Sequence, residues 1–439
     1  MKRKLTCALL VITLLFTTLA LSSCDILDYA MNQYFSASGE NSGGENNNDD
    51  NQSAGGTNDM SDANLTINAG DNYNVTINSA GESDLLAASR GLLSAVSVSC
   101  NFKVKTSMGY GPSSQVYEST AQSSGSGVIY KLNKESGDAY IITNYHVVYY
   151  YQSSTSNYIS NDINIYLYGM EYDEYAIPAT YVGGSMQYDL AVLKVEDSLV
   201  LAESSAMAAE FADSNDVSAL ETAIAIGNPE ANGISATVGC VNVESENITM
   251  TAADEISTVT MRLMRIDTPV NSGNSGGGLY NREGKLIGIV NAKLSSSSVE
   301  NIGYAIPSNI VKYITENILY YCDGTDEECV YRCLLGIRTA LKSSKAVYDT
   351  ETGKVHIVEE VKISGITTDS VAEGLFEVGD LINSITIDGV TYEVSRTYHV
   401  VDAMLNARTT STVSMNITRD GQTLDIEVDL SKVTPTAAV

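Results

Sequence analysis

The chain has 439 residues, a formal net charge of −29 and a hydrophobic content of 44%, with 27 Tyr, 5 Phe and no Trp. Its length predicts two folded domains and additional segments, and its hydrophobic content is sufficient for buried cores. A chain this acidic repels phosphate backbones, which excludes nucleic acids as partners. Tyr is the main aromatic residue available to fill strand faces and half-exposed surfaces.

The N-terminus predicts a secretion signal over residues 1–23. A basic start precedes the apolar run from Cys7 to Ala20, which is too short to span a bilayer. The next residues, LSSC, end at Cys24 and resemble the bacterial lipobox. That resemblance implies cleavage before Cys24 and a diacylglycerol group on its thiol. The alternative is an ordinary signal peptide with a coincidental cysteine.

Residues 24–85 predict a disordered acidic tether that begins with the lipidated cysteine. The stretch SASGENSGGENNNDDNQSAGGTNDMSDAN is polar and offers almost nothing to bury. The similar phrases NLTINAG and NVTINSAG follow it, and they indicate either a short strand pair or a chance echo. A tether of this length would hold the folded part away from the membrane.

Residues 86–322 predict a domain made mainly of β-strands. Short apolar runs such as YIITNYHVV, LAVLKV, TAIAIG and KLIGIVNA are separated by Gly, Ser and Asn, which is typical of a barrel or sandwich. A helix is predicted at the end, because Ile306, Ile310, Ile314 and Ile318 recur on one helical face. Ser308 is the expected N-cap of that helix.

Residues 323–333 predict a cysteine-containing linker. Outside the signal and Cys24, five cysteines remain, at positions 100, 240, 322, 329 and 333, and an odd number cannot pair completely within one chain. The last three cluster in CDGTDEECVYRC. A zinc site would need a fourth ligand and tighter pairs, so a local disulfide between two of the three is the prediction.

Residues 334–432 predict a second β-rich unit with a short helix in YHVVDAMLNA. A hairpin is expected at its end, because apolar residues alternate on two arms around the turn Asp420-Gly421. The alternating residues are Val413, Met415 and Ile417 on the first arm and Leu424, Ile426 and Val428 on the second.

Three residues of the first unit carry potential chemistry. Ser275 lies in NSGNSGGGLYN, where flanking glycines let the backbone turn tightly and direct N–H groups at one point. His146 ends an apolar strand and is the only histidine before residue 356. Asp189 precedes the apolar strand LAVLKV, where a buried carboxylate needs a partner such as an imidazole N–H. Alone, each residue is as well explained by a purely structural role.

Together these residues follow the chain order His, Asp, Ser, which is the order of the triad on chymotrypsin-type barrels. The phrases GSGVIY, TNYHVV, DLAVLKV, AIGNP, GNSGGGL and IGYAIP, in this order, resemble the HtrA/Deg family of serine proteases. The resemblance implies a chymotrypsin-like double β-barrel in which Ser275 attacks the scissile carbonyl. His146 would be the base and then the acid, Asp189 would orient it, and the N–H groups of Gly273 and Ser275 would form the oxyanion hole.

Two details concern the loop and the substrate pocket. The family usually has Pro after the glycine pair, whereas this chain has Gly278, a change that loosens the loop but removes no catalytic group. By resemblance the pocket is formed by LIGIVNAKL and the loop before NIGYAIP. No acidic residue occurs between Gly284 and Val299, so small aliphatic side chains are expected before the cut, although Glu300 follows directly.

The C-terminal unit resembles a PDZ domain, the usual companion in this family. LLGI would provide the carboxylate-binding loop and strand, with Leu335, Gly336 and Ile337 as the peptide-binding residues, and GLFEVGDLINSI resembles the PDZ phrase with a Gly-Asp turn. PDZ domains bind peptide C-termini by adding a strand to an open sheet edge. The alternative is a structural β domain.

The resemblance implies a serine endopeptidase outside the cytoplasm that hydrolyses unfolded or damaged proteins. A Ser triad needs no metal or organic cofactor, and the family suggests a homotrimer. The lipid anchor at Cys24 would place the protein on the cell surface of a monoderm bacterium or on the periplasmic face of a diderm membrane. A proteolytically silent chaperone or peptide sensor of the same fold is the alternative, and a narrow processing enzyme would retain the same chemistry.

Overall fold

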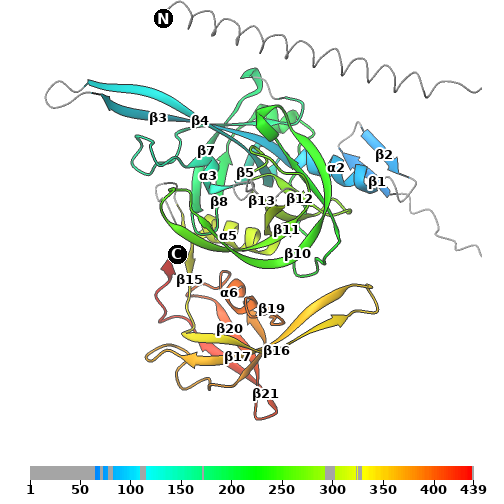
Figure 1. Ribbon diagram of the computed structural model, residues 1–439, viewed down its shortest axis with the longest axis vertical. Helices are drawn as coiled ribbons and strands as arrows, with labels where there is room; N and C mark the ends of the chain where they lie inside the picture. Colours follow the sequence, from blue (N-terminus) through cyan, green and yellow to red (C-terminus); the bar gives the residue numbers. More distant parts are fainter. Residues whose placement is uncertain are drawn as a thin grey trace, which may run out of the picture. The chain divides into compact units, whose positions relative to one another are not determined.

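The computed structural model describes residues 65–69, 73–77, 83–108, 115–170, 173–291, 302–322, 324 and 329–437 (Figure 1). The predicted signal peptide, Cys24 and most of the predicted tether lie outside the described residues. Strands β1 (Leu65–Ala69) and β2 (Tyr73–Ile77) pair antiparallel, which confirms the strand-pair interpretation of the two similar phrases. No helix within the described ranges is long and apolar enough to cross a bilayer.

Helix α2 (Ser83–Ser94) precedes the first barrel and begins inside the segment predicted as tether. Leu86 and Ala87 are buried, and Ser94 hydrogen-bonds at 2.8 Å to the Tyr280 hydroxyl, 186 residues away. The helix therefore belongs to the folded domain. Leu85 is exposed whereas Ser94 is buried, so residue type alone does not indicate which face of this helix packs against the barrel.

The first barrel is a closed six-stranded sheet in the order β3-β4-β5-β8-β7-β6. On β3, alternate residues Val96, Val98, Cys100 and Phe102 are buried, as expected for a strand with one face in a core. Its strands are β3 (Ala95–Met108), β4 (Gln115–Asn133), β5 (Asp138–Thr143), β6 (Asp162–Leu167), β7 (Ile177–Ser185) and β8 (Leu190–Val195), with α3 (Tyr145–Val148), η4 (Asp173–Tyr175) and α4 (Leu199–Glu203) between or after them.

The second barrel is also closed and six-stranded, in the order β10-β11-β14-β13-β12-β9. The two barrels confirm the predicted chymotrypsin-like double β-barrel, and each encloses its own apolar core. The elements of the second barrel are β9 (Thr222–Gly227), η5 (Pro229–Ala231), β10 (Ser235–Thr251), β11 (Thr258–Ile266), β12 (Gly278–Tyr280), β13 (Leu286–Val290) and β14 (Gly303–Pro307).

Helix α5 (Ser308–Tyr321) follows the second barrel, and Ile310, Ile314 and Ile318 are buried on one face as predicted. The prediction was wrong for Ile306, which is buried in strand β14 before the helix begins. The prediction that Ser308 is the N-cap is wrong. Pro307 is the N-cap, Ser308 is the first helical residue, and its hydroxyl donates to the carbonyl oxygen of Ala212 at 2.8 Å. The helix starts one residue early because Pro307, with φ of −57°, leads directly from β14 into the first turn.

The C-terminal unit contains a sheet in the order β16-β17-β18-β20-β21, with β19 paired to β18 and β16 at one edge. The predicted hairpin is confirmed, because Met415 pairs with Ile426 and Arg419 with Gln422 around Asp420-Gly421. Its elements are β15 (Tyr331–Arg332), β16 (Ile337–Tyr348), β17 (Val355–Ile366), β18 (Leu381–Ile387), β19 (Val390–Glu393), α6 (His399–Ala403), β20 (Thr412–Arg419), β21 (Gln422–Asp429) and β22 (Thr436–Ala437).

A disulfide joins Cys322 to Cys329, which confirms the predicted local bridge. The bridge packs on Gly183 of β7, where a Cβ atom would lie 2.5 and 2.6 Å from the two sulfur atoms, so only glycine fits there. The N–H of Cys329 donates to the carbonyl oxygen of Gly184 at 3.2 Å. The linker is thereby fixed to the first barrel on its way to the C-terminal sheet.

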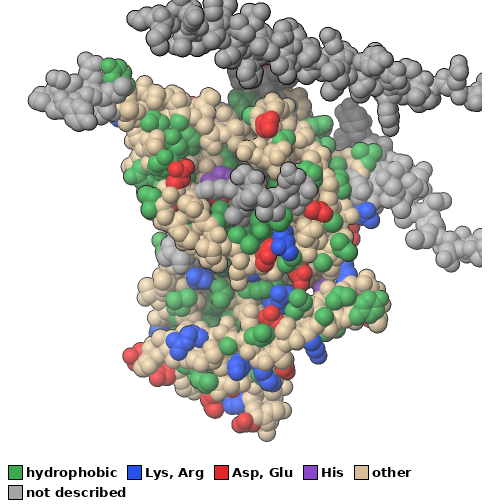
Figure 2. All heavy atoms as spheres, in the orientation of Figure 1, with side chains coloured by type: hydrophobic (Ala, Val, Ile, Leu, Met, Phe, Trp, Pro, Cys, Tyr) green, Lys and Arg blue, Asp and Glu red, His purple; other side chains and the backbone are tan. Residues whose placement is uncertain are grey.

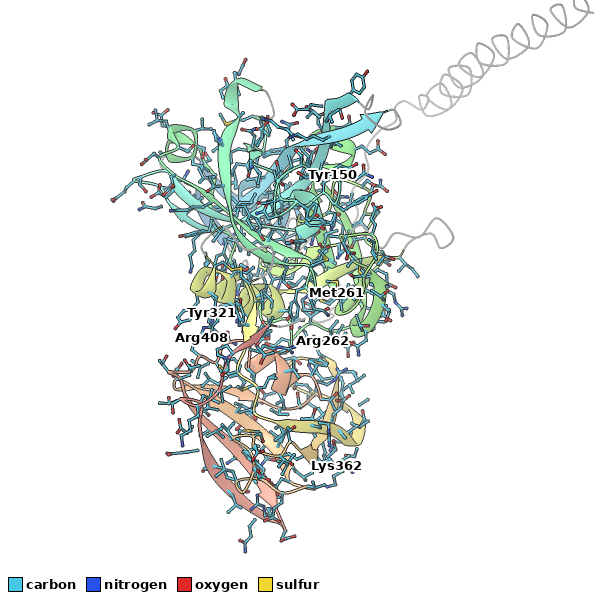
Figure 3. All side chains as sticks on the ribbon, turned by 90° about the vertical axis from the view of Figure 1, so that its left-hand side faces the viewer. Tyr150, Met261, Arg262, Tyr321, Lys362 and Arg408 are labelled. Atoms are coloured by element: carbon cyan, nitrogen blue, oxygen red, sulfur yellow. A yellow bond between two sulfur atoms is a disulfide. The ribbon has the colours of Figure 1, made fainter. Side chains whose placement is uncertain are left out.

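Polar contacts join the C-terminal sheet to the second barrel and α5. Arg262 of β11 forms an ion pair with Asp402 of α6 and lies 3.8 Å from the centre of the Tyr398 ring. Arg408 lies over the Tyr321 ring, with the guanidinium carbon 5.2 Å from its centre, and Figure 3 labels Arg262, Tyr321 and Arg408 in the region where the two parts meet.

Candidate active site

His146 lies in the short helix α3, which follows directly after the apolar strand β5 of the first barrel. Its ring Nδ1 lies 2.7 Å from Oδ2 of Asp189, and its backbone N–H donates to Oδ1 of the same carboxylate at 3.0 Å. A carboxylate oxygen can only accept, so Nδ1 carries the proton and Nε2 has a free lone pair. The structure therefore brings the two predicted residues together, as a buried carboxylate and its imidazole partner.

Asp189 is 5% exposed and adopts a left-handed backbone, with φ of +49°, immediately before β8. Burying a carboxylate is unfavourable unless hydrogen-bond donors replace water. Besides His146, the amide of Asn291 donates to Oδ2 at 2.9 Å, and the amide of Asn144 donates to the backbone carbonyl of Asp189 at 2.8 Å. Four donors from three residues thus hold the side chain and backbone of Asp189 in place.

Sequence analysis missed both asparagines, although each leaves a signal. Asn144 stands two residues before His146, and Asn291 directly follows the wholly buried strand β13. A polar residue that is 1% exposed at the end of such a strand needs a partner, but Asn291 lies 102 residues from Asp189. Only the closed barrels identify that partner.

The loop before β12 presents Ser275 between two glycines. Gly273 has φ of +94°, and a Cβ atom there would lie 2.2 Å from the carbonyl oxygen of Asn228, so only glycine is tolerated. Ser126 of β4 fixes the loop from the opposite barrel. Its N–H donates to the carbonyl of Ser275 at 2.8 Å, and its hydroxyl donates to the carbonyl of Gly273 at 2.6 Å.

The N–H groups of Gly273 and Ser275 are not donors in any backbone hydrogen bond formed within the described ranges. The neighbouring N–H groups are engaged, since Gly276 donates to Val290 and Gly277 to Asn274, each at 3.0 Å. The loop therefore keeps two backbone donors available beside the serine. Such a pair is what stabilises a developing oxyanion.

A cavity of about 310 Å³ contains His146, Gly273 and Ser275 together. Its other lining residues are Ser124, Tyr149, Tyr150, Tyr151, Ala253, Glu255 and Ser272. A larger cavity of about 970 Å³, between the second barrel and the C-terminal sheet, contains none of the predicted catalytic residues. The described residues include no cluster of three or more His, Cys, Asp or Glu side chains suited to a metal ion.

Gly278 is the first residue of β12 and stands where the HtrA/Deg family usually has a proline. A Cβ atom there would lie 2.4 Å from the ring of Tyr280, so the Tyr280 ring occupies the space above this glycine. Tyr280 is 1% exposed, and burial raises the pKa of its hydroxyl well above the ordinary value. The strand after the loop is therefore held by side-chain packing, not by a proline ring.

The predicted pocket wall is described only in part. Strand β13 (Leu286–Val290) is buried throughout, whereas residues 292–301, including Glu300, lie outside the described residues. The three tyrosines and Glu255 in the cavity lining were not predicted. The run YYYQ after His146 and the acidic hairpin ADEIS were the available signals, but nothing in the sequence brings them to one place.

The residues predicted to bind peptide in the C-terminal unit lie at the start of the edge strand β16. Leu335 is buried, Gly336 has φ of +83°, and Ile337 pairs with Ile366 of β17. The carbonyl of Gly336 accepts the N–H of Thr367 at 2.7 Å. These residues line neither of the two cavities.

Two closed barrels with a His–Asp pair and a glycine-flanked serine at one cavity define the class of chymotrypsin-like serine proteases. A family model for a trypsin-like peptidase domain matches residues 125–289. Similar proteins are "Serine protease Do-like HtrA" of Bacillus subtilis, 42% identical over 47% of this chain and 42% of its own length, and that of Lactococcus lactis subsp. cremoris, 33% identical over 71% of this chain and 72% of its own.

Among solved structures, an HtrA-type protease, AlgW with a decapeptide, is 23% identical and covers 80% of this chain and 98% of its own, with a TM-score of 0.46. The curated relatives are decisive, because the Lactococcus protein is matched over more than two thirds of its length. The chain belongs to the family of Do-like HtrA serine proteases.

Proposed function

We propose that the chain hydrolyses peptide bonds of unfolded or damaged proteins outside the cytoplasm, with His146, Asp189 and Ser275 as the triad. The observation that carries the proposal is the pairing of His146 with Asp189 at 2.7 Å in a cavity that also contains Ser275 and Gly273. A serine hydroxyl becomes an effective nucleophile only beside such a base and oxyanion donors.

In the first step Ser275 Oγ bonds to the scissile carbonyl carbon while its proton moves to His146 Nε2. The negative charge on the carbonyl oxygen is stabilised by the N–H groups of Gly273 and Ser275. The C–N bond then breaks as His146 protonates the leaving amine, and an acyl-enzyme remains. Water repeats the sequence through the same base and releases the acid. The protons pass only between Ser275, His146, substrate and water, so the chemistry calls for no cofactor.

The C-terminal sheet is proposed as a PDZ domain that binds peptide C-termini. In support, β16 is an edge strand, so an added peptide strand can pair with it. Leu335, Gly336 and Ile337 would hold the terminal carboxylate through backbone N–H groups. The proposed boundaries are 86–322 for the protease domain, with the start of α2 extending it to Ser83, 323–333 for the linker and 334–432 for the PDZ domain.

Extracytoplasmic location and membrane attachment are proposed from the N-terminal motif. Residues 1–23 would be removed and Cys24 lipidated, so that residues 24–85 tether the protease to the membrane. A homotrimer is proposed from the family resemblance. These proposals predict that radiolabelled fatty acid is incorporated into the parent chain and not into Cys24→Ser.

The proteolytic proposal is tested by incubating unfolded casein and a folded control protein with the full chain and with Ser275→Ala. The parent should degrade casein preferentially. Ser275→Ala should lose at least about 10⁴-fold in kcat, because the nucleophile is missing. If neither the parent chain nor Ser275→Ala cleaves casein, even with a C-terminal peptide added, the chain is a silent chaperone or peptide sensor of the same fold.

A further inference from the structure

The cavity beside the proposed nucleophile has an uneven chemical lining. Three consecutive tyrosines, Tyr149, Tyr150 and Tyr151, come from the chain just after His146, and Glu255 is the one acidic residue among the lining residues described. No Lys or Arg lines this cavity within the described ranges. The walls therefore combine aromatic faces with a single carboxylate, next to Ser275.

Glu255 reaches the cavity at the tip of the β10–β11 hairpin. The ladder ends at the pair Thr251 and Thr258, and the N–H of Glu255 then donates to the carbonyl of Ala252 at 3.2 Å. Asp254 closes the turn by accepting the N–H of Ser257 at 2.8 Å. Glu255 itself has φ of +62°, and it lines the cavity together with residues of the first barrel.

Hydrogen bonds join Tyr150 and Tyr151 through Gln152, and Glu255 lines the same cavity. The Tyr150 hydroxyl donates to Oε1 of Gln152 at 3.1 Å, and Nε2 of Gln152 donates to the Tyr151 hydroxyl at 2.8 Å. The pKa of Tyr151 is raised, first by loss of solvent and then by the negative charge of Glu255. The carboxylate of the second barrel therefore acts electrostatically on a tyrosine of the first barrel.

Glu255 has no ion-pair partner in the part of the chain that the structure describes. On the face shown in Figure 2, the Lys and Arg side chains gather mainly over the C-terminal sheet, with few over the first barrel. Tyr150, labelled in Figure 3, belongs to the first-barrel side of this site. The carboxylate therefore lacks a counter-charge of its own.

We infer that Glu255 and the tyrosines of this cavity form a substrate subsite that selects a Lys or Arg side chain close to the scissile bond. An aromatic face attracts a cation, and a carboxylate pairs with it, so the two wall types are complementary to the same ligand. The inference rests on the proposed proteolytic function, because it assigns a substrate preference to that same site. The carboxylate comes from the β10–β11 hairpin, so the subsite is separate from the pocket wall predicted between Gly284 and Val299.

The first experiment uses internally quenched peptides with one scissile bond and Lys, Gln or Glu placed in turn at each of four positions on either side. At one position the parent should cleave the Lys peptide with a kcat/KM about tenfold above that of the Gln peptide, as expected for an exposed ion pair combined with a cation–π contact. Added salt should reduce this ratio.

The variants then identify the residue responsible. Glu255→Gln should bring the Lys-to-Gln ratio close to one, and Glu255→Lys should favour the Glu peptide at the same position. Glu283→Gln is the matched control, because Glu283 is an exposed acid that pairs with Lys285 and does not line the cavity. It should keep the ratio of the parent.

A binding measurement separates failure of this inference from failure of the proposed function. The affinities of the Lys and Gln peptides are measured by fluorescence anisotropy with Ser275→Ala and with Ser275→Ala/Glu255→Gln. Tighter binding of the Lys peptide that depends on Glu255 supports the subsite, even if the parent does not cleave. Equal affinities for both peptides, or a Lys preference that Glu255→Gln leaves unchanged, would overturn it.

Discussion

Two histidines in this molecule occupy similar positions but have different surroundings. His146 lies in the four-residue helix α3 and His399 starts the five-residue helix α6. The Nδ1 of His146 lies 2.7 Å from the carboxylate of Asp189, whereas the Nδ1 of His399 lies between two backbone groups, 3.0 Å from the carbonyl oxygen of Glu393 and 3.3 Å from the nitrogen of Ser395. The His146 side chain lines a cavity together with Ser275, while the Nε2 of His399 is buried and has no hydrogen-bond partner in the described chain.

The comparison indicates what makes an imidazole useful as a base. A carboxylate beside Nδ1 stabilises the ring when Nε2 accepts a proton, and a carbonyl group does so much less. Around His399, burial and the nearby positive charge of Arg262 lower the pKa to about 4. The same side chain is therefore suited to proton transfer in the barrel and held neutral beside the C-terminal sheet.

The largest expected effect comes from Asp189→Asn, which gives His146 a neutral partner like that of His399. An amide cannot accept from all the donors that now meet the carboxylate, so His146 is expected to take the tautomer with the proton on Nε2. The value of kcat should fall about 10⁴-fold. Steady-state kinetics on casein-derived peptides measure this, with thermal unfolding to establish that the variant is folded.

A folded Asp189→Asn variant that retains kcat within tenfold of the parent would contradict the role given to the carboxylate. Glu283→Gln is again a suitable control, because it removes one exposed acidic charge without touching the site. Its kinetics should match those of the parent.

His399 should make stability depend on pH. Its pKa is lowered from 6.5 to about 4 in the folded chain, so between these values the unfolded chain binds more protons. The stabilisation is fully present above pH 6.5 and is lost as the pH falls toward 4. The free energy of unfolding of the C-terminal unit should decrease by about 2 kcal/mol from pH 7 to pH 5 through this group.

Urea unfolding at the two pH values measures that loss, and His399→Gln is the control because it cannot take up a proton. The decrease should be smaller in His399→Gln by the same amount. Equal decreases in the two proteins would mean that His399 is accessible to protons while folded, and its neutral state would no longer explain the contrast with His146.

The smallest effect is expected for Asn291→Ala, which tests how much Asn291 contributes to holding the carboxylate of Asp189. This change removes the donor at 2.9 Å from Oδ2 of Asp189 and leaves His146 as the main partner of that oxygen. Asn291 positions Asp189 and does not touch the substrate carbonyl in the proposed mechanism. We expect kcat to fall about tenfold, as for the loss of one hydrogen bond to a charged group, with KM unchanged.

Asn291→Asp is the informative companion variant. It is nearly the same size but places a second carboxylate against Asp189, so like-charge repulsion should lower kcat further than alanine does. If Asn291→Ala instead raised KM and left kcat unchanged, Asn291 would act in substrate binding and not in positioning Asp189.

Local patterns in the sequence predicted much of the fold. Alternating apolar residues in the hairpin after Thr412 and the four-residue spacing of isoleucines in α5 depend only on strand and helix periods, so both were recognised. Helix α2 was missed and the N-cap of α5 was placed one residue late. The first error arises because contacts with distant strands fix α2, and the second because the backbone of Pro307 leads directly into the first turn of α5.

The residues of the candidate site show the same difference between local pattern and distant contact. His146, Asp189 and Ser275 were predicted because the chemistry restricts their types, their order and the glycines around the serine. Asn291 and Glu255 were not, because each acts through a partner far away in the sequence. The amide of Asn291 meets Asp189 across 102 residues, and Glu255 meets the tyrosines only when the two barrels face each other.

The sequence by itself determined the β-rich class, the glycine loop and the three residues of the proposed triad, because these depend on short-range pattern and residue type. Only the tertiary structure decided how Asp189 is held, which hairpin supplies a carboxylate to the cavity, and which histidine stays neutral. These properties depend on burial and on donors and charges from distant segments. Burial and neighbouring charges set the strength of an electrostatic interaction, and these neighbours come together only when the chain has folded.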